Sequence, residues 1–304
     1  MDTNILLENG TNELEVLEFT IGSKHYGINV AKIKEILVYH EVTPIPNSAP
    51  CVEGIFMPRD TMITVIDLAK CLGFERTEEK GLFIITNFNK LDIAFHVDQV
   101  IGIHRVSWTE IIRPNQTVNV GNDGISTGII KLNDKLIIIL DFEKIVSDIN
   151  PETGLRVSQI EELGERERSD AKIVVAEDSP LLSRLITDCL HRSGYVNLTV
   201  CADGQEAWEV LRGYKAQGGN IFDYCDCIIT DIEMPRMDGH RLTKLVKEDD
   251  TLKALPLIIF SSLVNEEMRR KGEALGANAQ LSKPEIGELV NAIDNLIGES
   301  RTAM

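Results

Sequence analysis

Four short apolar runs in the second half of the chain, separated by amphipathic segments, constrain the fold more than any other feature. The runs cover residues 171–176, 227–230, 257–260 and 279–282. Helical periodicity between and after them predicts helices at about 180–192, 203–213, 238–248, 265–275 and 285–298. Strands that alternate with helices predict an α/β fold, a doubly wound parallel sheet with right-handed crossovers, over residues 171–299.

Charged or hydroxyl side chains stand where each of these runs ends. Glu177 and Asp178 follow the first run, Asp231 the second, Ser261 the third and Lys283 the fourth. The carboxyl ends of parallel strands lie at one edge of a sheet, where open α/β folds place their chemistry. An acid at a strand end can also simply terminate the strand. Agreement among five separated positions favours a functional site.

The chemistry of this set indicates phosphoryl transfer. Glu177, Asp178 and Asp231 would crowd negative charge, which raises carboxyl pKa values unless a cation is present. Mg²⁺ prefers such oxygen ligands together with a phosphate. Lys283 supplies a fixed positive charge and Ser261 a hydroxyl donor. Asp231 is then a carboxylate nucleophile, in a reaction that needs mainly positioning and charge neutralisation.

Helix-start signals flank both acidic segments. Ser179 and Pro180 are suited to the N-cap and first position of a helix. After Asp231, Met234-Pro235 predicts a loop, and Asp238 predicts the N-cap of the next helix.

The stretch Asp231-Ile232-Glu233-Met234-Pro235-Arg236-Met237-Asp238-Gly239 and its companions resemble a response-regulator receiver domain of the CheY type. The resemblance implies a flavodoxin-like sheet of order 2-1-3-4-5 and Mg²⁺-dependent phosphorylation of Asp231. Glu177, Asp178, Asp231 and the backbone carbonyl of Glu233 would hold the metal, and Ser261 and Lys283 would sense the phosphoryl group.

The chain departs from that family at two places. Gln280 stands where the family usually has an aromatic residue, three positions before the lysine, which puts the usual hydroxyl–aromatic switch in doubt. An insert at about 213–224 precedes the phospho-acceptor strand.

The first 150 residues predict a different architecture. β-like segments lie at about 14–21, 25–30, 53–58, 62–66, 82–87, 91–97, 101–106 and 135–140, with short helices expected at 30–37 and 67–72. Many short strands favour barrels or a sandwich. The four histidines of this part lack metal-ligand spacing and are expected to be solvent-facing or satisfied in the core: His25, His40, His96 and His104. The sequence of this half contains no catalytic constellation, which predicts a protein that is not an enzyme beyond the receiver's own phosphoryl transfer and dephosphorylation.

Residues 13–147 resemble a CheW-like coupling domain, through pieces such as Tyr26-Gly27-Ile28, Pro44-Ile45-Pro46 and Val65-Ile66-Asp67-Leu68 in the family's order. The resemblance implies two SH3-like five-stranded β-barrels. It also implies a CheA-type histidine kinase and methyl-accepting chemoreceptors as partners. Arg59 matches an arginine of the family, although its neighbours Met57, Pro58 and Asp60 differ. It would either contact a partner or be a solvated turn residue.

The remaining residues divide into a tail at 1–12, an acidic linker at 148–170 with a possible short helix at 158–163, and a tail at 300–304.

The net charge of −17 argues against nucleic-acid binding. The sequence shows neither a signal peptide nor an apolar run long enough to span a membrane. The six cysteines predict reduced thiols in a cytosolic protein. We expect a cytoplasmic location in association with chemoreceptor arrays.

A CheW-like half followed by a receiver resembles the CheV chemotaxis proteins. No output domain follows the receiver in this sequence, so we expect the first half to be the output. The resemblance implies an adaptor that couples kinase to receptor, with coupling changed by phosphorylation of Asp231. A phosphate sink without a coupling change and a receiver-gated enzyme are the alternatives.

Overall fold

The structure is a computed structural model. It describes residues 12–76, 80–88, 91–112, 125–132, 135–150, 166–263, 266–283 and 285–302. The chain divides into two compact units, one formed by residues 14–151 and one by residues 152–304 together with the first 13. The expected linker helix at 158–163 lies outside the described residues. Within the described ranges, no helix is long and apolar enough to cross a membrane.

The second unit contains a five-stranded sheet in which every pairing is parallel. Its strands are β11 (Ser169–Ala176), β12 (Tyr195–Cys201), β13 (Cys227–Thr230), β14 (Leu257–Ser261) and β15 (Ala279–Ser282). Their order, β12-β11-β13-β14-β15, confirms the predicted order 2-1-3-4-5. Strand β12 was not among the four apolar runs because it is a half-exposed edge strand with polar residues along it.

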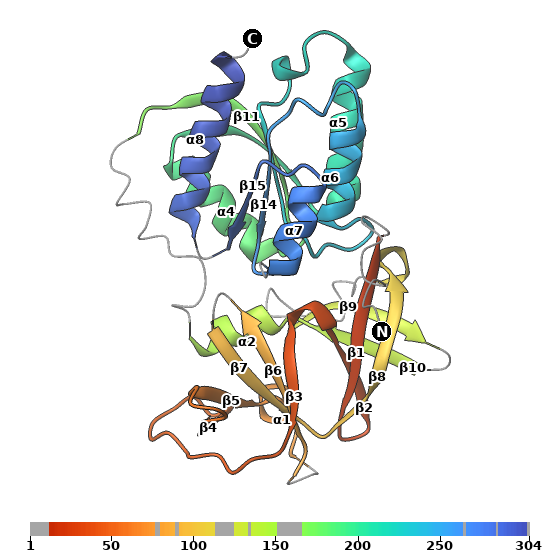
Figure 1. Ribbon diagram of the computed structural model, residues 1–304, viewed down its shortest axis with the longest axis vertical. Coiled ribbons are helices and arrows are strands. Elements are labelled where there is room, and N and C mark those ends of the chain that lie inside the picture. The colour runs from red at the N-terminus through yellow and green to blue at the C-terminus, as the bar shows by residue number, and fades with distance from the viewer. Residues whose placement is uncertain are drawn as a thin grey trace. The chain divides into compact units, whose positions relative to one another are not determined.

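Helices cover both faces of this sheet, and their expected positions are confirmed (Figure 1). One face carries α4 (Pro180–Arg192) and α8 (Ile286–Thr302). The other carries α5 (Gly204–Gln217), α6 (Gly239–Glu248) and α7 (Glu266–Ala274). Apolar side chains of the central strands pack against α4 and α8 to form the main core of the unit. This packing fixes the strand ends and therefore the groups that follow them.

The insert before β13 is an extension of α5 followed by a short 3-10 helix. Helix α5 continues to Gln217, and the 3-10 helix spans Ile221–Asp223. The rings of Tyr214 and Tyr224 stack with their centroids 5.8 Å apart, which closes the insert on itself.

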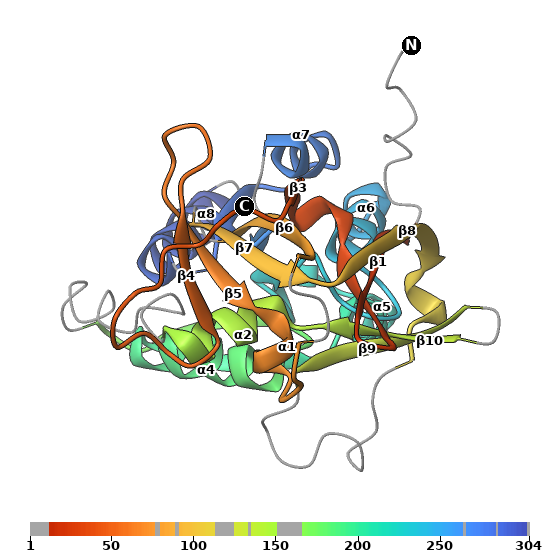
Figure 2. The same cartoon turned by 90° about the horizontal axis from the view of Figure 1, so that it is seen from below.

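The first unit contains two five-stranded sheets, as the resemblance to the CheW-like domain implied. One has the order β8-β1-β2-β10-β9 and the other β3-β6-β7-β5-β4. Figure 2 shows strands of both sheets. The strands are β1 (Glu13–Ile21), β2 (Lys24–Asn29), β3 (Ile33–Val38), β4 (Val52–Phe56), β5 (Ile63–Asp67), β6 (Leu82–Phe88), β7 (Leu91–Val97), β8 (Gln99–Ser107), β9 (Ser126–Leu132) and β10 (Lys135–Leu140). Two short helices, α1 (Leu68–Cys71) and α2 (Phe142–Ile149), pack on the largest apolar core.

The predicted helix at 30–37 was wrong. Only Val30–Lys32 form a 3-10 turn, and residues 33–38 form strand β3, paired antiparallel with β6. Burial alternates along β3, with every second side chain exposed. The apolar residues of this segment fit both a helical and a strand period, and its β-branched residues together with pairing to β6 decide for the strand.

The histidines of the first unit have partners within it. The carboxylate of Glu18 accepts from Nδ1 of His25 at 2.5 Å and from Nε2 of His104 at 2.6 Å. His96 Nδ1 lies 2.7 Å from a carboxylate oxygen of Glu53, and His40 stacks on Phe56. The contacts of His25, His40 and His104 agree with the expectation of solvent-facing or satisfied histidines. His96 agrees only in part, because its Nε2 is buried without a hydrogen-bond partner among the described residues.

We predict that stability depends on pH through Glu18. Burial acts to raise the pKa of its carboxyl, but hydrogen bonds from His104 and His25 outweigh burial, and the pKa lies below its ordinary value. A carboxyl whose pKa is lower in the folded than in the unfolded state stabilises the fold at pH values above its unfolded-state pKa. This stabilisation is lost as the pH falls through the folded-state pKa. We expect Glu18→Gln to lower the free energy of unfolding by about 1–3 kcal/mol at pH 7 and by much less below pH ~4.

Urea titrations across pH measure this difference. Glu15→Gln is the matched control, because Glu15 lies on the same strand in an exposed pair with Arg105. A Glu18→Gln penalty that is equal at pH 7 and pH 3 would contradict the prediction.

Candidate functional site

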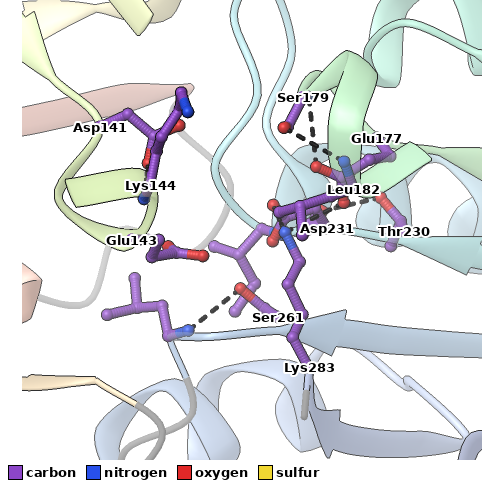
Figure 3. A network of polar contacts seen from close by, with 12 residues as sticks. Asp141, Glu143, Lys144, Glu177, Ser179, Leu182, Thr230, Asp231, Ser261 and Lys283 are labelled. Carbon is purple, nitrogen blue, oxygen red and sulfur yellow. Dashed lines mark hydrogen bonds and ion pairs between the residues drawn. The ribbon is translucent and has the colours of Figure 1, made fainter. Parts of the chain in front are cut away.

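The structure brings the predicted strand-end residues together at one edge of the parallel sheet (Figure 3). One carboxylate oxygen from each of Glu177, Asp178 and Asp231 can be chosen so that all three lie within 4.8 Å of one another. Ser261 ends β14, and Lys283 follows β15 directly. The shared edge follows from the parallel pairing of β11, β13, β14 and β15.

Lys283 lies between two of the acids. Its Nζ donates to Oδ2 of Asp231 at 2.5 Å and lies 3.0 Å from Oε2 of Glu177. The side chains of all three residues are almost completely buried. A buried charge needs a partner of opposite sign, and here one ammonium serves two carboxylates.

The excess of acid has a consequence for Glu177. Burial is the main cause that raises its pKa, and the nearby Asp231 carboxylate raises it further. Lys283 acts in the opposite direction, and the net effect raises the pKa of Glu177 to about 8. Three carboxyl groups and one lysine thus leave the cluster with a formal excess of acid.

Backbone groups orient the two acids. Oδ1 of Asp231 accepts from the backbone N–H of Ile232 at 2.6 Å, so its two oxygens point to different donors. The Thr230 hydroxyl donates to the backbone carbonyl of Asp231 at 2.8 Å. Oε1 of Glu177 accepts from the backbone N–H of Ser179 at 3.2 Å. Sequence reasoning did not identify Thr230, whose contribution depends on the local turn.

The donor set fits a hard divalent cation. Three carboxylates from two strand ends form an oxygen-only cluster, with two of its members buried. Mg²⁺ is typically held by one or two carboxylates, with waters completing its coordination shell. A cation bound here would also stabilise the ionised form of the acid whose pKa is raised.

The hydroxyl of Ser261 lies at the end of β14 with no exposed surface. Its Oγ accepts from the backbone N–H of Leu263 at 3.2 Å (Figure 3). The hydroxyl hydrogen remains available to a further acceptor, which a phosphoryl oxygen can supply.

The predicted N-caps are confirmed on both sides of the site. Ser179 caps α4, with Pro180 in the first turn, and Asp238 caps α6 through the N–H of Arg241 at 2.7 Å. Gly239 follows at a close approach, since a Cβ there would lie 1.8 Å from the carbonyl oxygen of Asp231.

Gln280 does not reach this cluster. Its Nε2 donates to the backbone carbonyl of Arg269 in α7 at 2.7 Å. A Cβ on Gly272 would lie 2.4 Å from the Gln280 amide oxygen, so the amide lies flat against the helix backbone. The residue that replaces the usual aromatic therefore forms a direct link between β15 and α7.

The loop after Asp231 carries a contact that sequence reasoning missed. Arg236 pairs with Asp203, the N-cap of α5. Asp203 is recognisable in the sequence as a cap before a helix, but no local pattern links it to an arginine that follows 33 residues later.

Arg59 belongs to the first unit and lies in the connection between β4 and β5, which pair antiparallel. Arg59 and Asp60 both have left-handed backbones, with φ of 51° and 67°. The Arg59 side chain is 81% exposed and lies 3.2 Å from Glu35. Two exposed methionines, Met57 and Met62, flank the turn.

Comparison with known proteins divides the chain at the same place. Residues 15–150 match the CheW-like domain, and residues 173–294 match the response regulator receiver domain. Chemotaxis protein CheV3 of Helicobacter pylori is 26% identical over 95% of this chain and 96% of its own length. CheV2 of the same organism is 27% identical over 91% and 93%. Chemotaxis protein CheW of Thermotoga maritima is 33% identical over 49% of this chain and 98% of its own.

The cap at Asp238 gives a stability prediction. We expect Asp238→Ala to lower the free energy of unfolding of the second unit by about 0.5–2 kcal/mol, because the first turn of α6 loses its side-chain acceptor. Asp238→Asn should cost far less, since asparagine is an equally good cap and burial raises the pKa of the native carboxyl. Chemical denaturation compares the two variants, and equal losses would show that the cap is not the cause.

Proposed function

The chain belongs to the CheW-like family and carries a receiver domain in the arrangement of the CheV proteins, and from this premise we propose that it is a chemotaxis coupling adaptor. It would join a CheA-type histidine kinase to chemoreceptors in cytoplasmic arrays, and phosphorylation of Asp231 would change that coupling. The observation that carries the phosphorylation proposal is the single Lys283 ammonium shared by buried Asp231 and Glu177, with Asp178 beside them.

In the proposed reaction, a carboxylate oxygen of Asp231 attacks the phosphorus of a kinase phosphohistidine. A P–O bond forms as the P–N bond breaks, and the imidazole leaves with the electron pair and takes up a proton. The hydrogen bond from Ile232 orients one oxygen of Asp231. This chain need supply no general base, because a carboxylate nucleophile has no proton to lose.

Mg²⁺ would be held by Glu177, Asp178, Asp231 and the backbone carbonyl of Glu233, and it would neutralise charge on the transferring phosphoryl group. Ionisation of Glu177, whose pKa is raised, would accompany binding of the cation. Lys283 is placed to exchange its contact with Asp231 for a phosphoryl oxygen, and Ser261 to donate to another.

Arg59 is our proposed partner contact in the first unit. Left-handed backbone costs a residue with a Cβ about 1–2 kcal/mol, and two such residues in sequence form this exposed turn. Such strain is found at functional positions. Arginine beside exposed methionines also has the composition of an interface centre.

The phosphoryl group can alter coupling only if it favours one domain arrangement over another, by about 1–3 kcal/mol in typical allosteric systems. A phosphate sink is the second candidate. It is favoured by one observation: the acids, hydroxyl and lysine of the site all lie within the receiver.

We predict that the protein accepts one phosphoryl group from phosphorylated kinase in a reaction that needs Mg²⁺. Asp231→Asn should accept none, because an amide is not a nucleophile, and chelation of Mg²⁺ should abolish transfer to the native protein. Asp250→Asn, at an exposed position, is the control. Radiolabel transfer and intact mass measure the product. If Asp231→Asn takes up label as well as the native chain, the phospho-acceptor assignment is wrong.

Adaptor and sink differ in their effect on kinase rate. In reconstituted receptor–kinase assemblies, phosphorylated kinase would serve as the phosphoryl donor for Asp231. Under these conditions we expect the native protein and Asp231→Asn to give different initial rates of kinase autophosphorylation. A sink drains phosphorylated kinase but leaves that rate equal for the two proteins. Equal rates with intact phosphotransfer would therefore establish the sink.

We expect Arg59→Ala to weaken binding to kinase or receptor about tenfold, or ~1.4 kcal/mol, because arginine often dominates interface energetics. Arg105→Ala is the matched control, an exposed arginine on β8 that pairs with Glu15. Pull-down and titration calorimetry measure both. Affinities that are equal for the two variants and the native chain would identify Arg59 as a solvated turn residue.

A further inference from the structure

Arg236 ties the loop between β13 and α6 to the start of α5. Its Nε and a terminal nitrogen both lie 2.5 Å from Oδ2 of Asp203. The Asp203 side chain is fully buried, whereas half of the Arg236 side chain is exposed. Charge-assisted hydrogen bonds to a buried carboxylate are among the stronger polar contacts in proteins. The loop is therefore tied to a buried residue, Asp203, through the Arg236 side chain.

Asp203 is a fixed point because its other oxygen caps a helix. Oδ1 accepts from the backbone N–H of Glu206 at 3.0 Å, and Ala207 and Leu211 bury the same helix against the unit. One oxygen of the carboxylate thus binds the start of α5, and the other binds the loop that follows Asp231.

The backbone around this contact is close-packed and strained. A Cβ on Gly204 would lie 2.6 Å from the carbonyl oxygen of Met237, so loop and helix meet without an intervening side chain. Arg236 has φ of 66°, a left-handed conformation that glycine adopts at far lower cost than arginine. An arginine at this position therefore brings a cost in backbone energy, which its guanidinium contact offsets.

A displacement at Arg236 would be transmitted to the acidic cluster over a short path. The loop begins after Asp231, and its far end lies close to its beginning. The N–H of Gly239 donates to the carbonyl of Ile232 at 2.9 Å. Gly239 also packs directly on the carbonyl of Asp231. Glu233 lies between the Ile232–Gly239 hydrogen bond and the Arg236–Asp203 pair. Its backbone is therefore constrained on both sides.

We propose that Arg236 is a positioning residue for the divalent-cation site. Through Asp203 it fixes the backbone from Asp231 to Glu233, so that the Asp231 carboxylate and the Glu233 carbonyl face the cation before it binds. This inference rests on the proposed function, because it assigns Arg236 a part in the same Mg²⁺ site. It predicts an effect on metal affinity that is separate from folding stability.

Two variants of the full chain test the contact from its two ends. Asp203→Asn keeps a good N-cap for α5 but removes the negative charge. Arg236→Gly removes the guanidinium and relieves the left-handed backbone. Lys215→Gln is the control, since Lys215 pairs with Asp249 at 2.6 Å on α5 outside the loop.

We expect titration calorimetry with Mg²⁺ to show a dissociation constant raised about five- to tenfold in each loop variant and unchanged in Lys215→Gln. The double variant should be no weaker than the weaker single one, because both substitutions remove the same contact. Hydrogen exchange over residues 232–238 of the metal-free protein should be faster in both loop variants. At saturating Mg²⁺, phosphotransfer to Asp231 should return to within about twofold of the native rate.

Two results would overturn the inference. One is Mg²⁺ affinity within twofold of native in both loop variants, which would leave Arg236 a structural contact only. The other is strictly additive losses in the double variant, which would show two unrelated effects. Failure of the proposed function has a different signature, since the native chain itself would then bind no Mg²⁺ or accept no phosphoryl group.

Discussion

The receiver half of this protein depends on one buried lysine shared by two carboxylates at the edge of a parallel sheet. Lys283 reaches Asp231 and Glu177 because β11, β13 and β15 run in the same direction and their carboxyl ends lie at one edge of the sheet. Parallel strands bring together the residues that follow each strand, whatever their separation in sequence. The ammonium partly offsets the cost of burying the two acids, but burial and the nearby Asp231 carboxylate still raise the pKa of Glu177.

The surroundings of the lysine determine what the site can do. Backbone N–H groups of Ile232 and Ser179 donate hydrogen bonds that orient the Asp231 and Glu177 carboxylates. The loop after Asp231 is anchored by the Asp238 cap and by the Asp203–Arg236 pair. Preorganisation of this kind lowers the cost of binding a metal or a phosphoryl group, because the groups need not be ordered on arrival.

Several predictions about the fold could be made because strong local patterns coincided with tertiary packing. The sheet order, the helices of the second unit and the caps at Ser179 and Asp238 were predicted from apolar runs and helix-start residues, together with the family resemblance. The segment 33–38 was predicted incorrectly, because its apolar residues fit two periods and pairing with β6 decided between them. The contact of Gln280 with Arg269 likewise depends on how close α7 lies to β15.

By itself, the sequence determined the identity and order of the strand-end groups, and with them the oxygen-rich chemistry of the site. It did so because those residues sit at boundaries that local periodicity marks. Only the tertiary structure decided which polar groups are paired: Glu18 with two histidines, Lys283 with two acids, and Arg236 with Asp203. The physical reason is that Coulomb and hydrogen-bond energies depend on distance and burial, and folding brings these partners within 3 Å across separations of up to 106 residues, as between Lys283 and Glu177.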